Sequence, residues 1–137
     1  MTSENIFVDT SAWIALADRA DAYHKKALSI YPSLLKTQKR LIISNLVVGE
    51  TYILILKELG HQAALLFLER LKSSPRISRV HSTDDIEIEA EEILKKYSDQ
   101  DFSYTDAASF VIMKLQDMTK AFSFDKHFVT AGFITLP

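Results

Sequence analysis

Short apolar runs alternate along this chain with longer segments in which apolar residues recur at helical spacing. The short runs predict five strands, at Asn5–Val8, Leu41–Ile43, Arg76–Val80, Ala121–Phe124 and Gly132–Leu136. The third run alternates between apolar and polar residues and is the weakest, which favours a position near a sheet edge. Strands that alternate with helices are typical of a parallel sheet covered on both faces.

The segments between these runs have the periodicity of helices. They predict helices over approximately Ser11–Arg19, Ala22–Lys36, Asn45–Leu59, His61–Ser73, Asp84–Tyr97 and Tyr104–Met118. Pro32 is expected to kink or split the second helix, whereas Ser44 or Asn45 can cap the third and Gly60 can end it. The predicted fold class is α/β, a three-layer α/β/α sandwich with a central, mainly parallel sheet of about five strands, in one domain over residues 1–137.

Composition narrows the function classes. The chain has no cysteine, which excludes disulfides, thiolate zinc sites and thiol catalysis. Its three glycines lie far apart, so a phosphate-binding glycine loop cannot be built. The net charge of -2 means that any nucleic-acid contact must be local or supplied by a partner.

Localisation is expected to be cytoplasmic. The longest apolar run, Tyr52–Leu56, is too short to cross a bilayer, so no membrane contact is expected. The first five residues lack the basic and apolar regions of a secretory signal.

Four carboxylates stand at the ends of predicted elements: Asp9, Glu50, Asp106 and Asp125. Strand carboxyl ends and the helix starts that follow them lie along one edge of a parallel sheet, where ligands bind. Four like charges in one cleft repel each other, and a bound divalent cation removes that conflict. Oxygen ligands without cysteine favour Mg²⁺ or Mn²⁺ over zinc.

Each carboxylate also has a simpler interpretation. Asp9 and Asp106 are well placed to cap helices. Glu50 has apolar neighbours on nearly every side, so we expect it to be partly buried and in need of a partner. His127 is interpreted as a structural residue of a turn, and Trp13 as a core or interface residue. The remaining histidines are expected to face solvent: His24, His61 and His81.

Four segments together resemble PIN domains, and most closely the VapC-type toxin ribonucleases and their stand-alone relatives. The resemblance covers nearly the whole chain and rests on the order and spacing of Phe7–Trp13, Ser44–Thr51, Tyr104–Phe110 and Phe122–Phe128. It implies a metal-dependent endoribonuclease, the toxin of a toxin–antitoxin pair, with RNA as substrate and a cognate antitoxin as partner protein. It also implies a homodimer.

The resemblance implies roles for individual residues. Asp9, Glu50, Asp106 and Asp125 fall on the family's acidic positions, and Thr10 or Thr105 on positions of supporting hydroxyls. Asp9 and Asp106 would be inner ligands of Mg²⁺ or Mn²⁺, with Asp125 completing the site. Glu50 would bind through water or orient the attacking water.

Two alternatives remain at this stage. One is a PIN-like fold that binds protein without turnover, and the other is a receiver-type phosphoacceptor domain. The lone Asp9 after the first strand weighs against a receiver, which needs an adjacent acidic pair there. Independently of the resemblance, the apolar helices around Tyr52–Leu56 and Ala63–Leu68 predict a surface that a two-fold dimer would cover.

Overall fold

The computed structural model describes residues 4–38 and 40–137, and five parallel strands form its sheet. Their order is β3-β2-β1-β4-β5, with bounds β1 Ile6–Val8, β2 Leu41–Ser44, β3 Ile77–Val80, β4 Lys120–Phe122 and β5 Ile134–Leu136. The helices are α1 Thr10–Ala17, α2 His24–Thr37, α3 Asn45–Leu59, α4 His61–Ser73, α5 Asp84–Lys96, α6 Tyr104–Leu115 and α7 His127–Thr130. Residues 1–3 lie outside the described residues; they belong to the first five residues, in which no features of a secretory signal were found.

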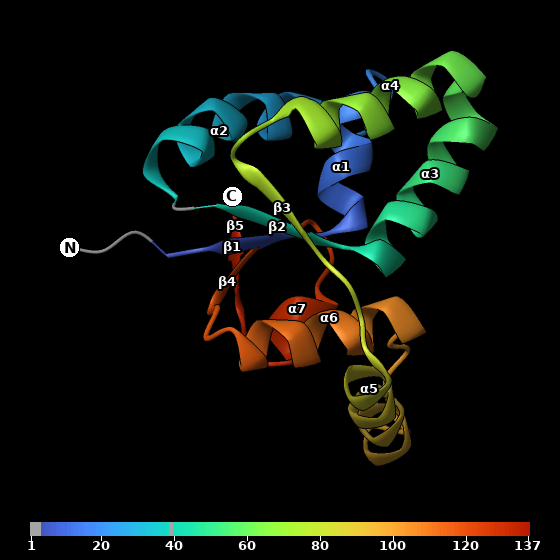
Figure 1. Cartoon of the computed structure of the whole chain (residues 1–137), viewed down its shortest axis with the longest axis vertical. Helices are drawn as coiled ribbons and strands as arrows, with labels where there is room; N and C mark the ends of the chain where they lie inside the picture. The colour runs from blue at the N-terminus through green and yellow to red at the C-terminus, as the bar shows by residue number, and fades with distance from the viewer. Residues whose placement is uncertain (1–3, 39) are drawn as a thin grey trace.

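Helices cover both faces of this sheet (Figure 1). The α1 to α4 helices lie on one face, α6 and α7 lie on the other, and α5 packs against α6. The predicted three-layer α/β sandwich is therefore confirmed. The strand order also excludes the receiver alternative, because a receiver-type sheet places its third strand beside the first. Here β1 pairs with β2 and β4, and β3 is at the edge.

Most predicted element ends are close to the observed ones. Ser44 caps α3 by accepting a hydrogen bond from the Val47 amide, 3.1 Å away. Gly60 follows α3 with φ of +94°, a conformation that a residue without a Cβ adopts at little cost. Pro32 lies within one continuous helix, α2, which it does not split. The prediction that β4 extends to Phe124 was wrong, since the strand ends at Phe122.

The central strand β1 is fully buried between the two helical layers. Trp13 is 6% exposed and its indole donates a hydrogen bond to the Val8 carbonyl, so its interpretation as a core residue is confirmed. His61 and His81 are exposed as predicted, but His24 is half-buried. Its Nδ1 lies 2.6 Å from the Ala15 carbonyl, because the start of α2 folds back onto α1.

Candidate active site

The cleft lies at the point where the order in which strands are added to the sheet reverses. From β1 the chain builds outwards through β2 to β3, then crosses back and adds β4 and β5 on the other side of β1. In such α/β sheets, ligands bind outside the carboxyl ends of the strands at this switch point. Asp9 directly follows β1, and its amide donates to the Phe122 carbonyl at the end of β4. A cleft of about 690 Å³ opens there.

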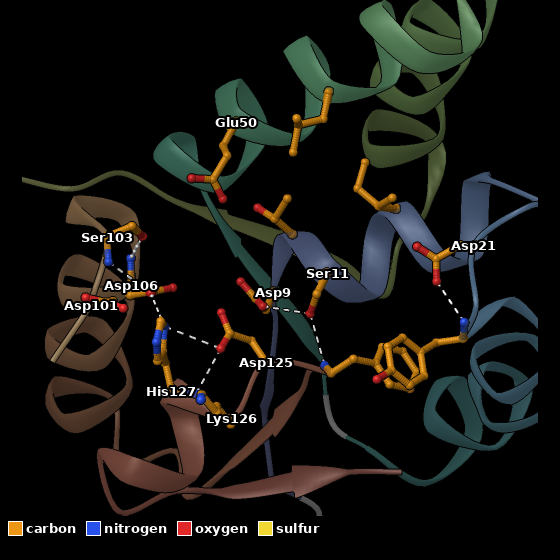
Figure 2. Close-up of a pocket in the computed structure, with 15 residues that line it drawn as sticks. Asp9, Ser11, Asp21, Glu50, Asp101, Ser103, Asp106, Asp125, Lys126 and His127 are labelled. Atoms are coloured by element: carbon orange, nitrogen blue, oxygen red, sulfur yellow. Dashed lines mark hydrogen bonds and ion pairs between the residues drawn. The ribbon is translucent and has the colours of Figure 1, made fainter.

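All four predicted carboxylates line this cleft (Figure 2). They come from the end of β1, the second turn of α3, the first turn of α6 and the loop after β4: Asp9, Glu50, Asp106 and Asp125. The structure therefore brings these four residues together in one cleft, as predicted, although they lie far apart in the sequence.

Asp9 is buried, with 4% of its surface exposed. It occupies the N-cap position of α1, yet its side chain does not cap the helix. Its Oδ2 instead accepts hydrogen bonds from the hydroxyls of Ser11, at 2.8 Å, and Ser123, at 3.0 Å. Those serines also accept from backbone amides beyond β4, Ser11 from Phe124 and Ser123 from Asp125. Asp9 is thus attached to the loop that carries Asp125.

Burial raises the pKa of Asp9 from 3.8 to about 6. The hydrogen bonds from Ser11 and Ser123 oppose this shift, and the nearby charge of Asp106 adds to it by a smaller amount. The net effect is that Asp9 binds a proton more tightly than an ordinary aspartate does. Its principal cause is removal of the carboxylate from water rather than repulsion between the acids.

Asp106 and Asp125 are joined by His127. The imidazole Nδ1 lies 3.0 Å from Oδ2 of Asp106 and 3.3 Å from Oδ1 of Asp125. Because ionised carboxylates only accept hydrogen bonds, Nδ1 carries the proton in this arrangement. Asp106 also forms a capping box with Ser103 at the start of α6, so its capping interpretation is correct, and it lines the cleft as well.

The other predicted positions differ in where they lie. Glu50 is half-buried, as expected, and its carboxylate points from α3 towards the other acids (Figure 2). Thr10 lines the cleft and accepts a hydrogen bond from the Thr51 hydroxyl. Thr105 does not line it, although it precedes Asp106 directly. The hydroxyls that contact the acidic residues are those of Ser11, Ser103 and Ser123.

Sequence reasoning missed several residues of the cleft. The additional polar ones are Ser11, Asp21, Asp101, Ser103, Lys126 and His127. Two of them could have been found from spacing, since Ser11 and His127 each stand two residues after a predicted acid. Asp21 and Asp101 gave no such signal, because both lie in loops between helices.

One wall of the cleft is apolar. Tyr23 and Phe124 stack on each other with ring centroids 4.5 Å apart and an angle of 10° between their planes. Ile14 and Leu54 complete this wall. The cleft is therefore lined by aromatic side chains as well as by acids.

The donor set fits a hard divalent cation. A carboxylate oxygen of Asp106 and one of Asp125 lie within 4.8 Å of each other, and the His127 imidazole contacts both residues. Among the described residues, no lysine or arginine forms an ion pair with Asp9, Asp106 or Asp125. Buried carboxylates without a cationic partner are costly, and a cation bound by oxygen atoms would compensate them.

An α/β/α sandwich with a cluster of acids at its switch point is suited to metal-assisted cleavage of phosphate esters. The chain belongs to the PIN domain family, whose sequence profile matches residues 6–134. The resemblance described from the sequence is thereby confirmed.

Two comparisons with individual proteins agree with this assignment. The chain is 37% identical over 130 residues to the 23S rRNA-specific endonuclease VapC20 of Mycobacterium tuberculosis, covering 94% of this chain and 95% of the relative. The crystal structure of M. tuberculosis VapC20, described as a Sarcin-Ricin loop cleaving toxin, superposes with a TM-score of 0.87 at 35% identity, covering 94% of this chain and 96% of that one.

A more distant solved structure shares the fold. VapBC2 from Rickettsia felis, bound to a DNA fragment from its promoter, matches with a TM-score of 0.72 at 12% identity, over 96% of this chain and 97% of that one.

In the part of the chain that the structure describes, no helix is long and apolar enough to cross a membrane.

Proposed function

We propose that this chain, acting as one domain over residues 1–137, is a divalent-metal-dependent endoribonuclease. The observation that carries the proposal is the convergence of Asp9, Glu50, Asp106 and Asp125 in one cleft at the switch point. The similarity to VapC20 along almost the whole chain supports RNA as the substrate.

Asp9, Asp106 and Asp125 would hold Mg²⁺ or Mn²⁺, with Glu50 beside them. The bound cation would supply an activated water and neutralise charge at the phosphate. Asp9 must lose its proton to act as a ligand, so the raised pKa predicts weaker cation binding below about pH 6. The hydroxyls of Ser11 and Ser123 favour the ionised form and fix the orientation of the carboxylate.

Two further groups would position reacting parts. His127 donates towards both Asp106 and Asp125 and keeps their carboxylates side by side. Glu50, half-buried and aimed into the cleft, would orient the attacking water. Lys126 is the lysine that lines the cleft and would meet the RNA backbone as a positive charge.

We further propose a toxin role in a toxin–antitoxin pair, with a cognate antitoxin as partner, in the cytoplasm. VapC20 is described as a toxin, and VapBC2 is a structural relative of the chain.

We also propose a homodimer. The α3 and α4 helices expose five large apolar side chains at 39–44% each: Ile53, Leu54, Leu59, Leu65 and Leu66.

A cleavage assay tests the nuclease proposal. Purified protein is incubated with RNA in Mn²⁺ and, separately, with a chelator, and Asp106→Asn is assayed beside the wild type. We expect cleavage that requires the cation and is lost in the variant. RNA that stays intact in Mn²⁺ would favour the alternative of a PIN-like binding module without turnover.

A further inference from the structure

The aromatic side chains of the cleft take no part in binding the cation or in activating water. Tyr23 precedes α2, and Phe124 lies in the loop between β4 and Asp125. Their rings stack in parallel, yet Tyr23 remains 44% exposed. Both side chains line the cleft, so the exposed part of this pair is available to a ligand bound there.

Hydrogen bonds hold the backbone that carries each ring. The Tyr23 amide donates to Oδ1 of Asp21 at 2.8 Å, and the Phe124 amide donates to the Ser11 hydroxyl at 3.0 Å. Ser11 in turn donates to Asp9 at 2.8 Å. Two hydrogen bonds therefore separate the backbone of Phe124 from the buried carboxylate (Figure 2). Asp9, Tyr23 and Phe124 line one cleft, in which a bound nucleotide can meet both the acids and this aromatic pair.

The charge of the cleft makes such an uncharged contact valuable. Six carboxylates line it, against Lys126 and His127: Asp9, Asp21, Glu50, Asp101, Asp106 and Asp125. This surface repels the RNA backbone except where a cation binds. Aromatic rings bind bases through their faces and need no positive charge, and every base offers such a face.

We propose that the Tyr23–Phe124 pair is a stacking platform for one unpaired nucleobase next to the phosphate that is cleaved. This inference rests on the proposed ribonuclease function and adds a base-binding subsite to it. Bases inside a duplex are already stacked on their neighbours, so the platform accepts single-stranded or looped RNA and discriminates against helical RNA.

Binding measurements test the platform. Fluorescence anisotropy in Mn²⁺ follows a labelled single-stranded RNA of about 12 nucleotides. Glu50→Gln serves as the parent, so that the RNA stays intact while Asp9, Asp106 and Asp125 can still hold the cation. Adding Tyr23→Leu should weaken binding about tenfold, and Tyr23→Phe should restore most of the loss because it keeps the ring. Tyr97→Leu is the matched control, since Tyr97 is 41% exposed but does not line the cleft.

The same RNA with all of its bases removed gives a second measurement. The parent should bind this abasic RNA more weakly than the intact RNA, and with the abasic RNA Tyr23→Leu should have no further effect. This comparison in the parent alone remains decisive if Tyr23→Leu does not fold, because equal affinity for the two RNAs contradicts the platform.

The outcomes separate the two proposals. If the wild type cleaves RNA, but Tyr23→Leu binds it as tightly as Tyr97→Leu does, the platform is wrong and the nuclease stands. If the wild type neither cleaves nor binds RNA in Mn²⁺, the ribonuclease proposal fails and the platform fails with it.

Discussion

Replacing Asp9 by asparagine should stabilise the cation-free protein at neutral pH and abolish RNA cleavage. Burial raises the pKa of the Asp9 carboxyl from 3.8 to about 6. The folded protein therefore binds the proton more tightly than the unfolded chain does. At pH 7 the Asp9 carboxyl is ionised in most folded and unfolded molecules. The free energy of unfolding is then about 3 kcal/mol smaller than at low pH, where the carboxyl is protonated in both the folded and the unfolded state.

The direction of the pH dependence follows from this difference. Because the folded pKa is the higher one, the stability associated with Asp9 is fully present below about pH 4 and is lost as the pH rises through about 6. Asparagine has no charge at any pH and lacks this loss. Its amide oxygen can accept from Ser11 and Ser123 where Oδ2 does now. We allow about 1 kcal/mol for imperfect replacement of these hydrogen bonds.

The net gain is then about 2 kcal/mol at pH 7, which corresponds to a rise in melting temperature of about 7 °C for a chain of this size. Thermal melts of both proteins in a chelator, from pH 4 to pH 8, measure it. The control is Asp101→Asn, which changes an exposed carboxylate that lines the same cleft. Equal melting temperatures of wild type and Asp9→Asn at pH 7, or a gap that widens as the pH falls, would refute the reasoning.

Three other outcomes are expected. Mg²⁺ or Mn²⁺ at ten times its dissociation constant should stabilise the wild type by about 1.4 kcal/mol. Asp106→Asn should weaken that saturable shift, and no shift at any concentration would count against the cation site. Ser123→Ala removes a hydrogen bond that lowers the pKa of Asp9, so the acid limb of the pH–activity profile should move to higher pH; an unmoved limb would contradict the role of Asp9. Light scattering of the wild type should give twice the monomer mass of 15.6 kDa, and Leu65→Glu should give the mass of a single chain; a monomeric wild type would contradict the dimer proposal.

The sequence was informative where one physical rule dominates. Strands such as Leu41–Ser44 are short and apolar because both faces of the sheet are covered, so their existence could be predicted. The four acids could be brought together because parallel strands end at one edge. The resemblance to PIN domains then gave them roles.

The missed features depend on tertiary contacts. His127 stands two residues after Asp125, but its contact with Asp106, 21 residues earlier, depends on how α7 packs against α6. The resemblance implied Thr10 or Thr105 as the supporting hydroxyl. The hydroxyls that contact the Asp9 carboxylate belong to serines, and one of them, Ser123, comes from the far end of the chain. The stacking of Tyr23 on Phe124 joins two loops about a hundred residues apart and leaves no periodic signal.

The central place of β1 in the sheet has a consequence for how the protein folds. Its partner β2 follows closely along the chain, whereas β4 on its other side arrives more than a hundred residues later. A half-folded chain containing only β1, β2 and β3 would leave one edge of β1 open, and such non-local parallel pairing is slow. Ser123 reaches Asp9, and Asp125 takes its place in the cleft, only when β4 docks. During refolding, the ability to bind a divalent cation should therefore arise in the slowest phase, after most helical structure has formed.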